Sequence, residues 1–277
     1  MNIAQTSATY IDHMGSDLSV VNAARASFDK ESEWLSTALG VPYPGYKIQM
    51  KHRFGAGPLG SACLKETDAK LIRFLARGYR TDEWADLVDS LTECGESEPI
   101  ERILLEFKNK AQHWAPFGHP HVTLRVEMPI FLARQFVKHQ VGGVWSEMSR
   151  RYVSDNLEFW FPDMWRSRPQ DVKQGSGDPV ADQQTCTDVA VRSTERALAA
   201  YQTLLAEGVT PEEARMVLPH NLMTTVIWTG SLLFWARVVN QRVEVHAQRA
   251  AQELGRKIAE QIRPYFPVCW AELVGEK

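Results

Sequence analysis

The spacing of apolar and polar positions predicts several helices and one clear strand. Asp17–Phe28 is expected to form a short helix with an acidic start, and Asp68–Arg77 and Ile100–His113 are amphipathic at helical spacing. His119–Glu127 instead alternates apolar and polar residues, which is typical of a strand with one buried face. Ala190–Glu207 contains few helix-breaking residues and is predicted to be helical.

The C-terminal third carries the strongest helical pattern. The run Thr210-Pro211-Glu212-Glu213 supplies an N-cap, a proline at the first helical position and a capping-box glutamate, so Arg215 is expected on the first turns of a helix. A longer helix is predicted from about Thr229 to Ile262. An apolar stripe advances along it by four, three and four residues and then continues into two polar positions. The stripe consists of Trp228, Leu232, Trp235 and Val239, followed by Arg242 and His246.

Two segments lack a regular pattern. Val41–Gly60 accumulates proline and glycine and is predicted to be a loop. Residues 166–184 are polar and rich in Gly, Pro and Asp, which indicates an exposed loop or a mobile lid. There is no internal repeat, and nothing in the pattern suggests two separable domains. A single domain over residues 1–277 is therefore expected.

Composition narrows the class of protein. The 277 residues are 44% hydrophobic and 23% charged, which is ordinary for a globular chain long enough to bury a core. The net charge of -3 argues against general nucleic-acid binding. The four cysteines form no CxxC pair, so neither a metal site nor a disulfide framework is indicated. No signal peptide and no apolar stretch of about 18 residues is present. We expect a cytoplasmic protein that does not associate with membranes.

The densest group of candidate functional residues lies in Pro129–Tyr152. On a helix, Gln135, Lys138 and His139 would share one face. After the Gly142-Gly143 break, Glu147, Ser149 and Arg151 alternate, so they would point together in an extended segment. Such a group would suit a small polar anion such as a nucleotide. The alternative is a surface ion pair beside ordinary exposed helix positions.

Arg242 is the second candidate, because a charged residue on an apolar stripe needs a partner or a ligand. Its alternative is a salt bridge to Glu244 or a solvated position. His246 could be a hydrogen-bonded core histidine, and Arg237 is expected to be solvated or to lie at an interface. Phosphate-loop, dinucleotide-binding, zinc-protease and serine-hydrolase motifs are absent from the sequence, and no metal site is predicted.

The sequence around these candidate residues resembles that of the flavin-dependent thymidylate synthases. That family carries Arg-His-Arg, followed after a short spacer by Ser within Glu-x-Ser-x-Arg-Tyr. The corresponding residues here are Lys138-His139-Gln140, then eight residues, then Ser149 within Glu147–Tyr152. Further matching segments extend the resemblance over most of the chain apart from residues 166–184. They are Asp12–Phe28, Pro116–Val122, Ala133–Gln135, Ala214–Pro219 and Trp235–Gln248.

The resemblance implies an α+β, single-domain enzyme of the thymidylate-synthase-complementing fold, with a small central sheet and long C-terminal helices. It implies a homotetramer whose active sites combine residues from several subunits. The implied reaction is the reductive methylation of dUMP to dTMP, with FAD as cofactor, methylenetetrahydrofolate as carbon donor and NADPH as reductant.

The resemblance also implies roles for individual residues. It implies catalytic roles for Arg242, which would polarise the uracil ring, and for Ser149. The positions that match dUMP-binding residues are Gln135, Glu147, Ser149, Arg151, Arg215 and Arg242. Those that match flavin-contacting residues are Ser27, His119, Lys138, His139, Gln140 and His246.

The chain departs from the family pattern at four positions. Lys138 and Gln140 replace both motif arginines, so both planar guanidinium forks and one positive charge are lost. Ser146 stands where the family usually has Asn, and Leu233 where it often has Arg. Two alternatives follow: a related flavin-dependent modification at C5 of another pyrimidine nucleotide, such as hydroxymethylation, or a relative that binds nucleotide or flavin without catalysis.

Overall fold

The computed structural model describes residues 1–35, 64–77, 113–169 and 175–275. The loop predicted at Val41–Gly60, and the helix predicted at Ile100–His113 except for its last residue, lie outside these ranges. Two compact units make up the chain. The first comprises Met1–Ile11, Thr123–Thr229 and Gln241–Ile258, and the second Asp12–Val122, Gly230–Asn240 and Ala259–Lys277. Each unit therefore draws on distant parts of the sequence.

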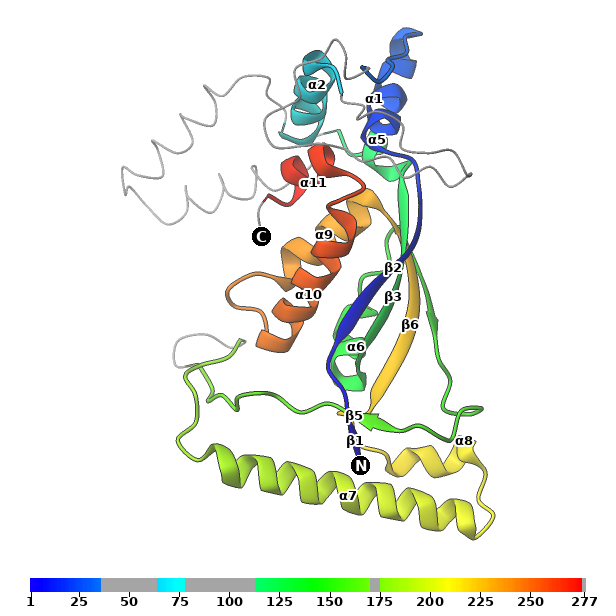
Figure 1. The fold of residues 1–277 in the computed structure, drawn as a ribbon, viewed down its shortest axis with the longest axis vertical. Coiled ribbons are helices and arrows are strands. Elements are labelled where there is room, and N and C mark those ends of the chain that lie inside the picture. The colour runs from blue at the N-terminus through cyan, green and yellow to red at the C-terminus, as the bar shows by residue number, and fades with distance from the viewer. Residues whose placement is uncertain (36–63, 78–112, 170–174, 276–277) are drawn as a thin grey trace. The chain divides into compact units, whose positions relative to one another are not determined.

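A four-stranded sheet runs in the order β2-β3-β6-β4 (Figure 1). Its strands are β2 (Ser7–Met14), β3 (His121–Pro129), β4 (Gly143–Glu147) and β6 (Met223–Ser231). A separate parallel pair joins β1 (Asn2–Ile3) to β5 (Glu158–Phe159). In β3, Val122, Leu124 and Val126 are buried and alternate with more exposed residues, so the predicted strand at His119–Glu127 is confirmed with a small shift.

The helix predicted from Thr229 to Ile262 is wrong at its start and in its middle. Strand β6 continues to Ser231, α9 spans Leu232–Arg242, and α10 begins only at Arg249 and ends at Ile262. The β-branched and aromatic residues of Met223–Ser231 alternate between buried and more exposed positions, which favours a strand. Between the helices, Gln252 Nε2 donates to Val245 O at 3.2 Å and Ala247 O at 2.9 Å, which stabilises the turn.

Two shorter helices match the predictions only in part. Helix α6 (Ile130–Phe136) ends before Lys138-His139-Gln140, so these residues do not share a helical face with Gln135. Helix α8 (Pro211–Ala214) is a single turn without a side-chain cap, and Arg215 begins the 3-10 turn η2 (Arg215–Val217). Proline at the first helical position is confirmed, but one turn is too short to sustain a helix past Ala214.

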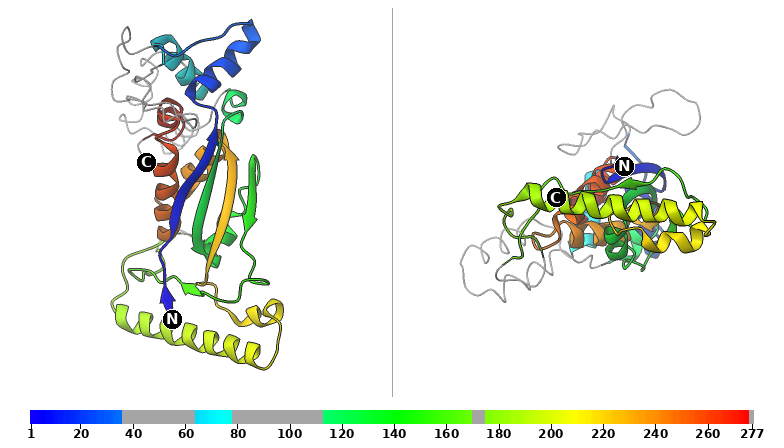
Figure 2. Two further views of the ribbon diagram at one scale, coloured as in Figure 1. Left: turned by 45° about the vertical axis from the view of Figure 1, so that its right-hand side comes forward. Right: turned by 90° about the horizontal axis from the view of Figure 1, so that it is seen from below.

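The long helix α7 (Gln183–Ala206) confirms the prediction at Ala190–Glu207 and begins seven residues earlier. The Asp182 carboxylate caps it by accepting from Thr185 N at 2.9 Å. Figure 2 shows α7 beside α8 in the first unit, near the β1–β5 pair. No helix within the described ranges is both long and apolar enough to cross a membrane.

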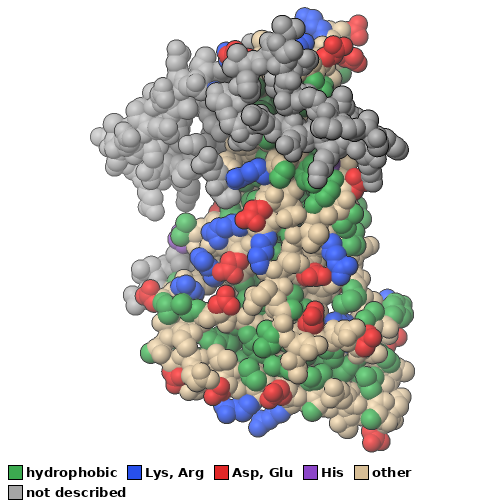
Figure 3. All heavy atoms as spheres, viewed as in Figure 1, with side chains coloured by type: hydrophobic (Ala, Val, Ile, Leu, Met, Phe, Trp, Pro, Cys, Tyr) green, Lys and Arg blue, Asp and Glu red, His purple; other side chains and the backbone are tan. Residues whose placement is uncertain are grey.

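Helix α10 is amphipathic. Leu254, Ile258 and Ile262 are fully buried at intervals of four residues. The opposite side carries charged residues of both signs, including the ion pair between Arg249 Nε and Glu253 Oε1 at 2.8 Å. Figure 3 shows positive and negative side chains interspersed on this face of the protein.

In the second unit, a buried carboxylate joins two helices that are far apart in sequence. Asp17, at the start of α1 (Asp17–Arg25), is 1% exposed and accepts from Val268 N at 2.9 Å and Cys269 N at 3.0 Å. These amides belong to the first turn of α11 (Pro267–Leu273), where they have no intrahelical acceptor. Burial raises the pKa of Asp17, although its hydrogen bonds with Cys269 and Val268 act in the opposite direction. The unit also contains η1 (Ala26–Phe28), α2 (Glu66–Arg77) and α5 (Ala115–Gly118), which confirms the helices predicted at Asp17–Phe28 and Asp68–Arg77.

We predict that Asp17→Ala lowers the free energy of unfolding by about 2–4 kcal/mol, because it leaves two buried amides without an acceptor. Urea unfolding followed by circular dichroism measures this effect. Glu33→Ala, at an exposed position of the same unit, should change stability by less than about 0.5 kcal/mol. Equal stabilities of the two variants would contradict the role given to Asp17.

Candidate functional site

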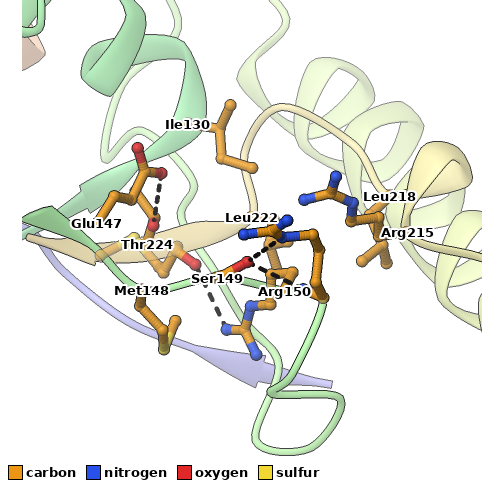
Figure 4. Close-up of a pocket in the computed structure, with 11 residues that line it drawn as sticks. Ile130, Glu147, Met148, Ser149, Arg150, Arg215, Leu218, Leu222 and Thr224 are labelled. Carbon is orange, nitrogen blue, oxygen red and sulfur yellow. Dashed lines mark hydrogen bonds between the residues drawn. The ribbon is translucent and has the colours of Figure 1, made fainter. Parts of the chain in front are cut away.

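A pocket of about 430 Å³ in the first unit collects most of the predicted nucleotide-binding residues. The end of β4 contributes Glu147, the segment after it contributes Ser149, and η2 contributes Arg215 (Figure 4). Arg151, two residues after Ser149, also lines the pocket. The strand ends at Glu147, so the predicted extended segment is shorter than expected, yet the three alternating residues still line one pocket. The remaining lining residues are Ile130, Met148, Arg150, Leu218, Leu222, Met223 and Thr224.

The carboxylate of Glu147 is held by a donor on each oxygen. Thr224 Oγ1, from β6, donates to Oε1 at 2.9 Å, and Trp145 Nε1 donates to Oε2 at 3.2 Å. Thr224 is itself buried. Two such donors fix the direction of the carboxylate, so it can accept from a ligand without first reorganising.

The cationic side of the pocket contains two exposed guanidinium groups and one hydroxyl. Arg151 Nε donates to Ser149 Oγ at 3.1 Å and Nη1 lies 3.8 Å from Glu212 Oε1. Arg215 Nε donates to the Glu212 backbone carbonyl at 3.0 Å. Glu212 thus positions both arginines through different atoms. Two cations and a hydroxyl beside one pocket form a site suited to an anion such as a phosphate.

Arg150 lines the same pocket and was missed by the sequence prediction. It is only 8% exposed, and its Nη1 donates to Asp155 O at 2.9 Å while Nη2 donates to Met223 O at 3.5 Å. Burial lowers the pKa of its guanidinium. Alternation placed it on the face opposite Arg151, and its tertiary partner could not be recognised from sequence. Arg150 secures the turn that carries Ser149 and Arg151.

Arg242 forms a second cluster in the first unit. Its Nε donates to His139 Nε2 at 2.9 Å, its Nη2 donates to Gln135 O at 2.7 Å, and its guanidinium lies 5.4 Å from the centre of the Phe136 ring. In the part of the chain that the structure describes, Arg242 has no ion pair with Glu244, and its Nη1 has no protein partner. The fork is therefore anchored at two nitrogens and can donate from the third.

His139 is held as a neutral acceptor. Burial, followed by the positive charge of Arg242, lowers its pKa from 6.5 to about 4. Because Nε2 accepts from Arg242, the proton of the neutral ring is on Nδ1. The Gln135 side chain extends the cluster by donating from Nε2 to Gln248 Oε1 at 2.7 Å.

We predict that His139 makes the protein less stable toward acidic pH. Between pH 6.5 and about 4, the unfolded chain binds a proton at this residue that the folded chain does not. The free energy of unfolding should therefore decrease as the pH falls through this window. His139→Gln, which keeps an acceptor for Arg242 but does not titrate, should remove this part of the slope in urea titrations at several pH values. His246→Gln, at an exposed position, should retain it, and a slope shared by all three proteins would contradict the assignment.

The predicted site residues thus fall into separate groups. Glu147, Ser149, Arg151 and Arg215 line the pocket, whereas Gln135, His139 and Arg242 form the second cluster. Lys138, Gln140 and His246 are exposed in the first unit, and Ser27 and His119 are exposed in the second. The sequence assigned no role to Thr224 or Gln248, which bind Glu147 and Gln135 from distant segments.

Together, the mixed sheet-and-helix fold and the arginine-lined pocket define an α+β protein with a pocket suited to a small anion. The profile of the thymidylate synthase complementing protein family, Thy1, matches residues 9–268. The chain belongs to this family, so the family resemblance of its motifs is confirmed.

Curated relatives agree with this assignment. The chain is 32% identical over 168 residues to a flavin-dependent thymidylate synthase of Thermus thermophilus, covering 61% of this chain and 62% of that protein. It is 34% identical over 157 residues to the flavin-dependent thymidylate synthase of Thermosipho africanus, covering 56% of this chain and 68% of that protein. The match therefore spans less than two thirds of the Thermus protein.

A solved structure confirms the fold over nearly the full chain. The crystal structure of PolB from Streptomyces cacaoi, a UMP/dUMP methylase bound with 5-Br dUMP, aligns with a TM-score of 0.68 and 23% identity. The alignment covers 98% of this chain and 96% of PolB. The expected α+β fold of the thymidylate synthase complementing family is thereby confirmed.

Proposed function

We propose that this chain is an FAD-dependent thymidylate synthase, a methyltransferase that converts dUMP to dTMP. Methylenetetrahydrofolate would supply the carbon and NADPH the reducing equivalents. The observation that supports the proposal is the pocket that brings together Glu147, Ser149, Arg151 and Arg215. The family resemblance of the sequence assigns these four residues to dUMP binding.

The pocket would bind the nucleotide by charge and hydrogen bonding. Arg151 and Arg215 would donate hydrogen bonds to the phosphate. The Ser149 hydroxyl would donate a hydrogen bond to the nucleotide, and the fixed Glu147 carboxylate would accept one from a ligand hydroxyl or ring N–H. Arg242, half-buried and anchored at two nitrogens, would place Nη1 against negative charge developing on the uracil ring. The hydrogen bond from Gln135 to Gln248 would hold the Gln135 side chain of this cluster in place.

The donor chemistry of the remaining residues fits FAD. Ser27, His119, Lys138, Gln140 and His246 provide exposed hydroxyl, imidazole, ammonium and amide groups, which suit phosphates and ribose. Neutral His139 adds an Nδ1 donor. When bound, the flavin would supply the hydride for methyl formation. We further propose a cytoplasmic homotetramer in which residues of different subunits complete each site, as the family resemblance implies.

Product analysis tests the function directly. Protein loaded with FAD and supplied with dUMP, methylenetetrahydrofolate and NADPH should form dTMP, identified by chromatography and mass spectrometry. Formation of dTMP should stop when any one component is omitted. Flavin-loaded protein that binds dUMP but yields no dTMP would refute the proposal and leave the non-catalytic alternative.

A second substrate is favoured by one specific comparison. PolB is described as a UMP/dUMP methylase and has also been crystallised with 5-Br UMP, in a structure that aligns with this chain at a TM-score of 0.68 and 20% identity. Parallel reactions with UMP and dCMP, analysed for methylated and hydroxymethylated products, distinguish C5 modification of another pyrimidine nucleotide from dTMP synthesis.

We predict that Ser149→Ala weakens dUMP binding without abolishing chemistry. Losing one neutral hydrogen bond should raise KM for dUMP by about 2- to 10-fold, whereas kcat should change little. Steady-state kinetics measure both constants. Ser193→Ala, on α7 and outside this pocket, is the matched control. A complete loss of turnover with normal dUMP binding would show that Ser149 has a chemical role instead.

A further inference from the structure

A larger cavity of about 680 Å³ lies elsewhere in the first unit and shares no lining residue with the pocket around Ser149. Its walls come from residues 160–166, from α7 and from the start of α10. Four of the lining side chains are aromatic: Phe131, Trp160, Phe161 and Trp165. Polar and charged side chains make up about half of the lining residues, and the volume of the cavity lies in the range of small-molecule sites.

The aromatic walls are held in place. The backbone N–H of Trp165 donates to Gln183 Oε1 at 2.7 Å, and Gln183 Nε2 donates back to Trp165 O at 2.8 Å. The Trp165 indole donates to Thr187 Oγ1 at 3.0 Å. The Phe131 and Trp160 rings lie with their centres 5.4 Å apart and their planes at 59°. Fixed aromatic faces favour a planar ring as the ligand.

Asn221 offers the cavity an oriented acceptor. Its Nδ2 donates to Trp160 O and to Thr194 Oγ1, each at 3.2 Å. Thr194 donates its own proton to Ala190 O at 2.9 Å, so its oxygen must accept from Asn221 and the amide orientation is defined. Within the described residues, the Asn221 Oδ1 atom has no protein partner.

Gln248 offers a complementary donor. Its Oε1 accepts from Gln135 Nε2 at 2.7 Å, and its own Nε2 has no protein partner in the described part of the chain. Asn221 and Gln248 both line the cavity. One acceptor and one donor match the adjacent N–H and C=O groups of a lactam ring.

The charges of the cavity favour an uncharged ligand. Arg166 and Arg249 are balanced by Asp163 and Glu253, and Arg249 is already paired with Glu253 at 2.8 Å. The lining therefore carries no net charge with which to attract a phosphate. This distinguishes the cavity from the arginine-lined pocket.

We propose that this cavity binds an uncharged heteroaromatic molecule through a lactam edge. The ring lies against the aromatic walls, its N–H donates to Asn221 Oδ1, and its carbonyl accepts from Gln248 Nε2. Pyrimidine nucleosides, flavins and pterins all carry this edge. The site is additional to the proposed dUMP pocket and does not depend on thymidylate synthase activity.

Calorimetric titration of the full chain with thymidine, riboflavin and pterin tests the proposal and distinguishes the three sources. At least one of them should bind saturably. The N3-methylated analogue of the ligand that binds should lose about tenfold or more in affinity, because it cannot donate to Asn221. This comparison uses the unaltered protein. Saturable binding by none of the three, or equal affinity for the methylated analogue, overturns the proposal.

Two substitutions on α7 locate the binding. Ala190→Phe introduces a ring into the cavity and should lower affinity at least about tenfold, whereas Ala199→Phe, exposed on the same helix and outside the cavity, should bind as the parent does. Unchanged binding in a folded Ala190→Phe protein overturns the location. Both variants should retain dUMP binding at the Ser149 pocket. Titration with dUMP therefore shows whether a variant has lost ligand binding only in the larger cavity or in both sites.

Discussion

Replacing Arg242 with alanine is expected to lower kcat by about 10²- to 10³-fold at saturating dUMP, which is the scale of losing one preorganised donor to developing negative charge. The fork is held by His139 Nε2 and the Gln135 carbonyl, so Nη1 is placed before the substrate arrives. The KM for dUMP should change much less than kcat, since the interaction strengthens only as charge develops.

Two matched variants separate this role from a structural one. Arg242→Lys keeps a positive charge but loses the planar fork, so it should recover only part of the rate. Arg237→Ala removes an exposed arginine from the same helix and should leave kcat unchanged. In Arg242→Ala the pKa of His139 should rise, because a neighbouring positive charge is removed, and NMR titration of the imidazole measures this. Near-normal kcat in a folded Arg242→Ala protein would refute the proposed role.

The sequence predicted local periodicity well and tertiary partners poorly. The alternation around Val122 and Leu124 correctly indicated a strand, because its period reflects one buried face. The apolar stripe through Trp228 and Leu232 was correct in burial but wrong in structure, since Trp228 belongs to β6 and Leu232 begins α9. A spacing of four residues cannot distinguish a continuous helix from a strand that ends where a helix begins.

For the candidate site too, the sequence predicted the local grouping of residues but not their long-range contacts. The motif identified Glu147, Ser149 and Arg151 correctly as neighbours in one pocket. It could not show that Arg215 reaches the same pocket through Glu212, or that Thr224 fixes the Glu147 carboxylate. These contacts join segments separated by many residues, and they depend on how the strands pair, which no local pattern encodes.

Removing Arg151 and Arg215 together is expected to weaken dUMP binding most strongly. Each charge-assisted hydrogen bond contributes about 1.5–3 kcal/mol, so each single alanine variant should raise Kd by about 10- to 100-fold. Because Glu212 contacts both arginines, the two losses are coupled, and the double variant should lose less than the product of the single effects. Equilibrium titration with dUMP measures all four proteins of this cycle.

The nature of the ligand group is tested by comparing dUMP with deoxyuridine, which lacks the phosphate. If Arg151 and Arg215 bind the phosphate, the double variant should weaken dUMP binding strongly and leave deoxyuridine binding nearly unchanged. The affinity of the parent protein for dUMP should also fall as salt increases, because both guanidinium groups are exposed and screened by ions, and the double variant should lose this dependence. Equal weakening of both ligands would instead place the arginines against the base or sugar.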